Sequence, residues 1–201
     1  MNASLPSVYL ARHGETAWSV SGQHTGRTDL PLTPQGEANA RALGERLRGL
    51  TFSLVLTSPL QRARRTCELA GFGQVAIADA DLAEWDYGDY EGKRTAEIIA
   101  SRPGWQLFRD GCPNGESADQ VGARADRAIA RARAASGGVL MFSSAHILRV
   151  LGARWLGLPA SGGRYFILGT ASLSVVGYEH DMTESVIKFW NDTAHVPPLA
   201  K

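Results

Sequence analysis

The sequence has very little cysteine, and its cysteines are not arranged as a site. Its 201 residues include two, Cys67 and Cys112, which lie far apart in unrelated surroundings. Two cysteines are too few for a disulfide scaffold or a zinc site, so we predict two reduced thiols. The sequence also lacks a His-Glu-x-x-His motif, a phosphate-loop lysine motif and a dinucleotide fingerprint. Zinc hydrolases, nucleotide hydrolases and dehydrogenases are therefore disfavoured, and no cofactor or metal is implied.

Long apolar runs and an excess of charge of either sign are missing too. No apolar stretch is long enough to cross a bilayer, and residues 1–7 show no basic start followed by an apolar segment. We therefore expect a cytoplasmic protein. Lys and Arg total 21 against 20 Asp and Glu, so no broad field attracts nucleic acid or a membrane, and neither is expected as a partner. Any anion must be bound by a local group of donors.

What the sequence does contain is the ordinary composition of one globular domain. Hydrophobic residues make up 44% and charged residues 20%, and the length suits a single core, so residues 1–201 are treated as one domain. Short apolar runs alternate with segments of helical periodicity. This alternation predicts a three-layer α/β/α fold with a mostly parallel central sheet.

The boundaries follow from apolar runs, capping residues and glycines. Strands are expected at Ser7–Ala11, Ser53–Thr57, near Val75–Ala78, Val139–Phe142, Ser172–Tyr178 and Ser185–Phe189. Helices are expected from Thr33-Pro34 to near Gly49, from Ser58-Pro59 to about Ala70, around Thr95–Ser101, Ser117–Ala135 and His146–Leu156. Because the carboxyl ends of parallel strands share one edge, the residues that follow the first, second and fourth strands should lie together.

Side chains suited to a phosphate ester stand at that edge. Arg12 and Arg62 present planar forks that match phosphate oxygens, and helix-start amides add positive charge. An imidazole in line with the phosphorus can act as nucleophile and form a phosphohistidine, and His13 is the candidate. A protonated Glu84, in the loop after the third strand, can supply the leaving group's proton and then activate water. Activity is therefore expected to be highest at mildly acidic pH.

Five stretches of the sequence carry these residues: Leu10–Thr16, Thr25–Gly26, Leu32–Glu37, Ser58–Ala63 and Glu84–Gly88. Together they resemble the histidine phosphatase superfamily, also called phosphoglycerate-mutase-like, over the region from about Tyr9 to Gly157. Residues 21–26 and 109–117 are more similar to the acid phosphatase and sedoheptulose-bisphosphatase-like branch than to the glycolytic mutases. The resemblance implies a phosphoglycerate-mutase-like fold and a metal-independent phosphatase for a small phosphorylated metabolite, with sugar phosphates as one candidate.

The resemblance also implies roles for individual residues. His13 would be the phosphorylated histidine, Arg12 and Arg62 the phosphate ligands, and Glu84 the proton donor and acceptor. The wall of the pocket would include Ser19, Thr25 and Gly26. Three nearby aromatic residues form either a further wall or part of the core: Trp85, Tyr87 and Trp105. No pattern sets the oligomeric state, so a homodimer stays open.

One family position is not matched. After the fourth strand the family usually has His-Gly, whereas this chain has Phe142-Ser143-Ser144-Ala145-His146, which puts Ser144 where a second active-site histidine is expected. Loss of such a group lowers a rate by about a hundredfold or more. Either Ser144 with nearby amides or a reoriented His146 compensates, and we favour Ser144. Two alternatives to a phosphatase remain: a catalytically weak phospho-ligand-binding protein, and a phosphoglycerate mutase.

Overall fold

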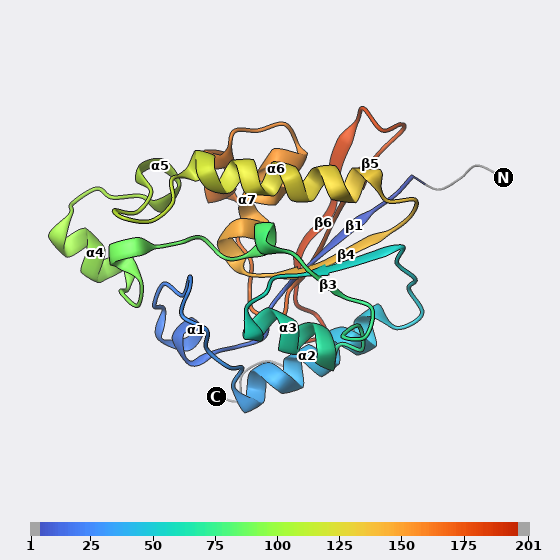
Figure 1. Ribbon diagram of the computed structural model, residues 1–201, viewed down its shortest axis with the longest axis horizontal. Helices are drawn as coiled ribbons and strands as arrows, with labels where there is room; N and C mark the ends of the chain where they lie inside the picture. Colours follow the sequence, from blue (N-terminus) through green and yellow to red (C-terminus); the bar gives the residue numbers. More distant parts are fainter. Residues whose placement is uncertain (1–4, 197–201) are drawn as a thin grey trace.

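The computed structural model describes residues 5–196, which are built around one six-stranded sheet in the order β3-β2-β4-β1-β5-β6 (Figure 1). Its parallel strands are β1 (Val8–Arg12), β2 (Leu54–Thr57), β3 (Ile77–Ala78) and β4 (Val139–Ser143). At the other edge, β5 (Leu173–Tyr178) runs antiparallel to β1, and β6 (Ser185–Asp192) antiparallel to β5. The predicted α/β/α fold with a mostly parallel sheet is confirmed.

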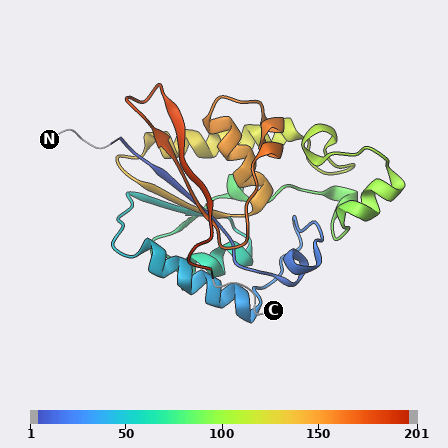
Figure 2. The ribbon, with the colours of Figure 1, turned by 180° about the vertical axis from the view of Figure 1, so that it is seen from behind.

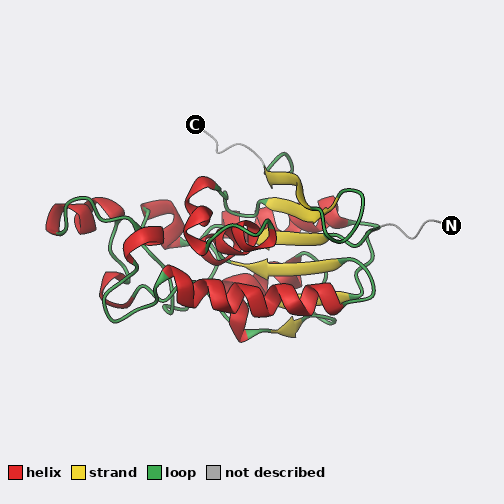
Figure 3. Cartoon of the chain, turned by 90° about the horizontal axis from the view of Figure 1, so that it is seen from above, coloured by secondary structure: helices red, strands yellow, loops and turns green. Residues whose placement is uncertain are grey.

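Helices cover both faces of the sheet. On one face lie α2 (Pro34–Leu47) and α3 (Gln61–Leu69); the other, seen in Figure 3, is covered by α6 (Ala118–Ala134) and α7 (Ala145–Trp155). Successive strand residues point to opposite faces. Leu10 therefore packs in the core under α6 and α7, and Ala11 in the core against α2 and α3. Both faces need apolar residues, which explains the continuous apolar runs in the sequence.

Two predicted helix starts are confirmed and one is wrong. The Thr33 side chain accepts the N–H of Gly36 at the start of α2, and Ser117 forms a capping box with Gln120 at the start of α6. The helix predicted from Ser58-Pro59 begins later, at Gln61. Ser58 Oγ instead accepts the N–H of Leu60 at 3.4 Å, so these residues form a turn that precedes α3.

Two short helices were not predicted, α1 (Ala17–Ser21) and α5 (Leu107–Asp110), whereas α4 (Thr95–Ser101) was. Helices of one turn show too little periodicity to be recognised in a sequence. The segment with α4 and α5 joins β3 to α6 and extends past the end of the sheet (Figures 1 and 2). It brings further side chains towards the carboxyl ends of the parallel strands.

Both cysteines are free and buried, in agreement with the prediction of two reduced thiols. Burial raises the pKa of the Cys67 thiol and of the Cys112 thiol to about 12. Thiols that stay protonated are poor nucleophiles, so we assign neither a catalytic role. Among residues 5–196, none of the helices combines the length and the apolar character needed to span a bilayer.

Candidate active site

A cavity of about 240 Å³ opens at the carboxyl edge of the parallel strands. Its lining includes Arg12 and His13 from the end of β1, Glu84 from the loop after β3, and His146 from the first turn of α7. Two residues expected in the pocket wall, Ser19 and Thr25, line it too. Adjacent parallel strands end at one edge, which is why segments distant in sequence meet here.

His13 presents a free ring nitrogen to this cavity. Its Nδ1 lies 2.7 Å from the carbonyl oxygen of Gly14. Burial, reinforced by the guanidinium groups of Arg12 and Arg62, lowers the pKa of His13 well below its ordinary value. The ring is therefore neutral near neutral pH, and Nδ1 donates its proton to the carbonyl. Nε2 is left with a lone pair and can act as a nucleophile.

Close backbone packing holds this histidine in place. The N–H of Gly14 donates to Thr66 Oγ1 of α3 at 3.0 Å. A Cβ on Gly14 would lie 2.3 Å from the carbonyl oxygen of Gly36, and a Cβ on Gly36 would lie 2.2 Å from that of Glu15. The two glycines thus allow the end of β1 and the first turn of α2 to touch.

Arg12 supplies positive charge next to His13. Its Nη1 donates to the carbonyl oxygen of Leu168 at 2.5 Å, while its Nε is buried and has no hydrogen-bond partner among the described residues. Burial lowers the pKa of Arg12 to about 10, a shift that the Glu84 carboxylate opposes. The side chain remains charged at neutral pH. Because Arg12 lines the cavity, its guanidinium group places a positive charge beside any anion bound there.

Arg62 lies behind the cavity wall and is fully buried. Its Nη2 donates to the carbonyl oxygens of Thr25 and Gly26 at 2.9 and 3.0 Å, and its Nη1 to that of Thr28 at 3.0 Å. Its Nε approaches Ser144 Oγ at 3.4 Å. Most of its donors are therefore used within the protein, and its predicted role as a phosphate ligand stays a prediction.

Glu91 holds the same loop from the other side. Its carboxylate accepts the N–H of Gly26 at 2.9 and 3.0 Å and that of Thr28 at 3.1 Å. Gly26, expected in the wall of the phosphate pocket, does not line that cavity; it borders a separate one on the far side of Glu84. No local pattern marks Glu91 in the sequence, because its partners are backbone amides of a distant loop.

Glu84 lies at the N-terminus of α7. Oε1 accepts the N–H groups of Trp85 at 2.8 Å and Ile147 at 3.0 Å, and Oε2 accepts that of His146 at 3.0 Å. The helix start thus fixes the orientation of the carboxyl group. Oε2 has one donor partner and keeps a lone pair that can carry a proton. Together with its place in the cavity wall, this suits Glu84 to donate and accept a proton.

Of the two groups considered for the missing histidine, His146 lines the cavity and Ser144 does not. His146 Nδ1 lies 2.5 Å from the hydroxyl oxygen of Tyr87. Burial raises the pKa of Tyr87 and lowers that of His146, each by a wide margin, so the phenol keeps its proton and donates it to Nδ1. His146 therefore carries its own proton on Nε2. The Ser144 hydroxyl contacts Arg62 behind the cavity wall, and its compensating role stays a prediction.

The sequence and the structure of this chain are similar to those of known proteins. The family model of the histidine phosphatase superfamily (branch 1) matches residues 8–193. The chain belongs to this superfamily. An acid phosphatase from Mycobacterium tuberculosis is 41% identical over 197 residues, which cover 96% of each chain. The sedoheptulose 1,7-bisphosphatase of Saccharomyces cerevisiae is 40% identical over 190 residues, covering 79% of this chain and 70% of that protein.

A solved structure agrees with these sequence matches. The product of an open reading frame of Mycobacterium tuberculosis superimposes with a TM-score of 0.85 at 39% identity, over 92% of this chain and 97% of that one. The predicted superfamily is confirmed, and with it the predicted class of enzyme, a phosphoric monoester hydrolase of the histidine phosphatase type.

The cavity of this histidine phosphatase has further lining residues that sequence reasoning did not assign: Trp18, Gln23, His24 and Thr95. They come from α1, the loop after it and the start of α4. Nearness in sequence to Ser19 and Thr25 was a signal for the first three, and Thr95 had no such signal. The three aromatic residues considered for a further wall of the pocket lie in different places. Tyr87 lines this cavity, Trp105 lines an adjoining one, and Trp85 is a core residue whose indole N–H donates to the carbonyl oxygen of Glu116.

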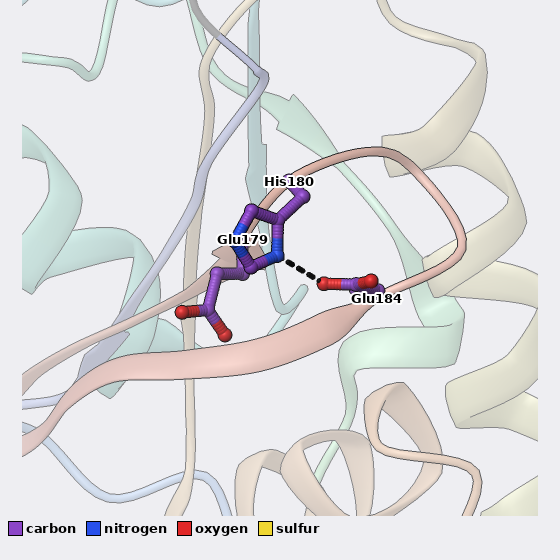
Figure 4. Close-up of side chains that lie close together, drawn as sticks. All are labelled: Glu179, His180 and Glu184. Atoms are coloured by element: carbon purple, nitrogen blue, oxygen red, sulfur yellow. Dashed lines mark hydrogen bonds and ion pairs between the residues drawn. The ribbon is translucent and has the colours of Figure 1, made fainter.

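A separate group of potential metal ligands lies on the turn between β5 and β6 (Figure 4). The ligand atoms of Glu179, His180 and Glu184 lie within 4.8 Å of one another, and His180 Nδ1 is 2.5 Å from Glu184 Oε2. All three residues are exposed. Because Val8 pairs with Val176, this turn lies beyond the amino end of β1, away from His13. The group therefore takes no part in the phosphate cavity of the histidine phosphatase.

Proposed function

We propose that this histidine phosphatase hydrolyses small phosphate monoesters through a phosphohistidine formed at Nε2 of His13. The observation that carries the proposal is that His13, with its free Nε2, lines one cavity together with Arg12 and Glu84. The phosphatase activities named for the mycobacterial and yeast relatives support it. The proposal includes the expectations of a cytoplasmic location and of a small phosphorylated metabolite as partner.

The reaction has two half-reactions that return the enzyme unchanged. In the first, Nε2 of His13 bonds to phosphorus as the ester P–O bond breaks, and Glu84 gives its proton to the departing alkoxide. In the second, Glu84 takes a proton from water, the water oxygen bonds to phosphorus and the P–N bond breaks. The products are the alcohol and inorganic phosphate. The guanidinium group of Arg12 stabilises the charge on the phosphoryl oxygens.

The test is to trap the covalent intermediate. We expect an isotopically labelled phosphate ester to leave one labelled phosphoryl group per chain on His13, and His13→Asn to abolish both label and turnover. The quench uses alkaline detergent, because the P–N bond of phosphohistidine is hydrolysed in acid. Full turnover by His13→Asn, or a label mapped to another residue, would contradict the proposal.

One observation favours a second candidate, a phospho-ligand-binding protein with weak catalysis. Ser144 replaces a histidine that the family usually has, and its hydroxyl contacts Arg62 and not the cavity. Ser144→His distinguishes the two functions. A near-silent parent with a large gain in the variant supports the binding protein, whereas a parent that already turns over at an enzymatic rate supports the phosphatase.

A further inference from the structure

A second cavity adjoins the phosphate cavity. This neighbouring cavity, here called the α4 cavity, has a volume of about 450 Å³ and shares three lining residues with the first: His24, Thr95 and His146. The combined space falls within the usual range for a small-molecule site, roughly 300–1,000 Å³. A phosphate held at His13 would therefore direct the rest of its ester past these three residues and into the α4 cavity.

The α4 cavity has an apolar and uncharged lining. Beyond the shared residues its lining consists of Ile99, Gly104, Trp105, Gln106 and Leu107. None of the described residues that line it is Lys, Arg, Asp or Glu. The two histidines at its entrance add no charge near neutral pH, because burial lowers the pKa of His24 and, by a wider margin, that of His146.

Three arginines of the neighbouring segments do not line the α4 cavity. Arg109 donates to Asp110 and to the carbonyl oxygen of Gly104. Arg149, which lies over the ring of Phe108, donates to the carbonyl oxygens of residues 163 and 164. Arg102 is exposed and lines neither cavity. A second phosphate or a carboxylate in the α4 cavity would therefore face an apolar lining that holds no cationic side chain, which is unfavourable.

We infer that the α4 cavity binds the leaving group, and that the preferred substrates are monophosphates of neutral alcohols or phenols with an apolar or aromatic body. This inference rests on the proposed phosphatase function. Such a leaving group gains free energy by removing apolar surface from water against Ile99, Trp105 and Leu107. The Nε2–H of His146 at the entrance can donate to its ester or hydroxyl oxygen. Bisphosphates and phosphorylated carboxylic acids should be poor substrates.

The experiment compares two substrates that differ by one charge. The full chain is assayed with 2-naphthyl phosphate and with the same ester bearing a carboxylate at the far end of the ring system; fructose 1,6-bisphosphate is a third substrate, and p-nitrophenyl phosphate reports activity as such. We expect kcat/KM for the carboxylated ester to be lower by about tenfold or more. Fructose 1,6-bisphosphate should be hydrolysed with a lower kcat/KM than 2-naphthyl phosphate.

A positive charge added to the wall of the α4 cavity tests whether the leaving group binds there. Ile99 is 42% exposed, so Ile99→Lys places an ammonium group at the α4 cavity without burying it. We expect this variant to narrow the difference between the two naphthyl esters by about tenfold. Ile77→Lys is the matched control, because Ile77 is 59% exposed on β3, lines neither cavity and receives the same charge. It should keep the selectivity of the parent.

Different outcomes of these experiments test the substrate class, the role of the α4 cavity and the proposed phosphatase function. Equal or higher kcat/KM of the parent for the carboxylated ester or the bisphosphate overturns the substrate class while the phosphatase function stands. An unchanged selectivity in Ile99→Lys overturns the assignment of the leaving group to the α4 cavity. Absence of turnover with all four esters, p-nitrophenyl phosphate included, refutes the proposed function, and the inference with it.

Discussion

The chemistry of the cavity depends on the positions of three protons. The Nδ1 proton of His13 is held by a backbone carbonyl, and the phenol proton of Tyr87 is directed to His146. Burial keeps the pKa values of both histidines low and that of Tyr87 high, so these protons do not move within the ordinary pH range. Under the proposed mechanism the proton that is transferred is carried by Glu84, whose Oε2 accepts one N–H group, that of His146.

Glu84→Gln tests this assignment. Without a transferable proton, hydrolysis of an alkyl phosphate should fall by roughly 10² to 10⁴. Formation of the phosphoenzyme from p-nitrophenyl phosphate should fall much less, because its leaving group needs no proton. The measurement is kcat for both esters over a pH range of about 5 to 9. The parent should lose activity on the alkyl ester as pH rises, and an identical profile in Glu84→Gln would refute the role.

Glu91 is expected to act as a positioning residue. Its carboxylate binds the N–H groups of Gly26 and Thr28, whose carbonyl oxygens in turn bind Arg62. Glu91→Gln offers one acceptor oxygen instead of two and should lower the free energy of unfolding by about 1–3 kcal/mol. Urea denaturation measures this change, with Glu45→Gln as the control, because Glu45 pairs with Arg48 on the surface. Equal effects in the two variants would contradict the role.

The sequence was sufficient to locate some of these residues and not others. Arg12, His13 and Glu84 could be predicted because each follows a strand that is recognisable as a short apolar run. The orientation of Arg62 could not, since its partners are carbonyl oxygens of residues 25–28, more than thirty positions earlier in the chain. The same holds for Glu91. Contacts of this kind depend on how distant segments pack, which local patterns do not encode.

A helix or strand could be predicted where residues in the sequence mark its ends. Capping residues marked the starts of α2 and α6, and apolar runs marked the strands. The reversed direction of β5 and β6 and the single-turn helices α1 and α5 have no such local signal. Because α1 and α5 lie near the cavities, the walls were harder to predict than the catalytic edge.

The contact between β1 and α2 is expected to be intolerant of a single methyl group. A Cβ on Gly36 would lie 2.2 Å from the carbonyl oxygen of Glu15, two residues after His13. Gly36→Ala should therefore cost about 1–3 kcal/mol of stability and reduce turnover. Gly138→Ala is the matched control, because a Cβ there meets nothing closer than 3.5 Å. The two variants are compared by urea denaturation and by kcat; similar stabilities would contradict the prediction.

Burial of the two active-site histidines lowers the stability of the whole molecule at acidic pH. His13 and His146 are both buried, and their pKa values lie well below the ordinary value of about 6.5. As pH falls through that value, the unfolded chain takes up a proton on each histidine and the folded chain does not. The unfolded state is thereby favoured. Activity is expected to increase towards mildly acidic pH, whereas stability is expected to decrease there.

We predict that these two histidines do not lower the free energy of unfolding above about pH 6.5. Below that pH, each of them should lower it by up to ~1.4 kcal/mol per pH unit. Urea denaturation between about pH 7 and 5 measures the slope. His146→Gln removes one proton uptake by the unfolded chain and should flatten the slope. An equal slope in the parent and in His146→Gln would show that His146 takes up its proton in the folded state, and a neutral His146 would then be lost from the cavity entrance.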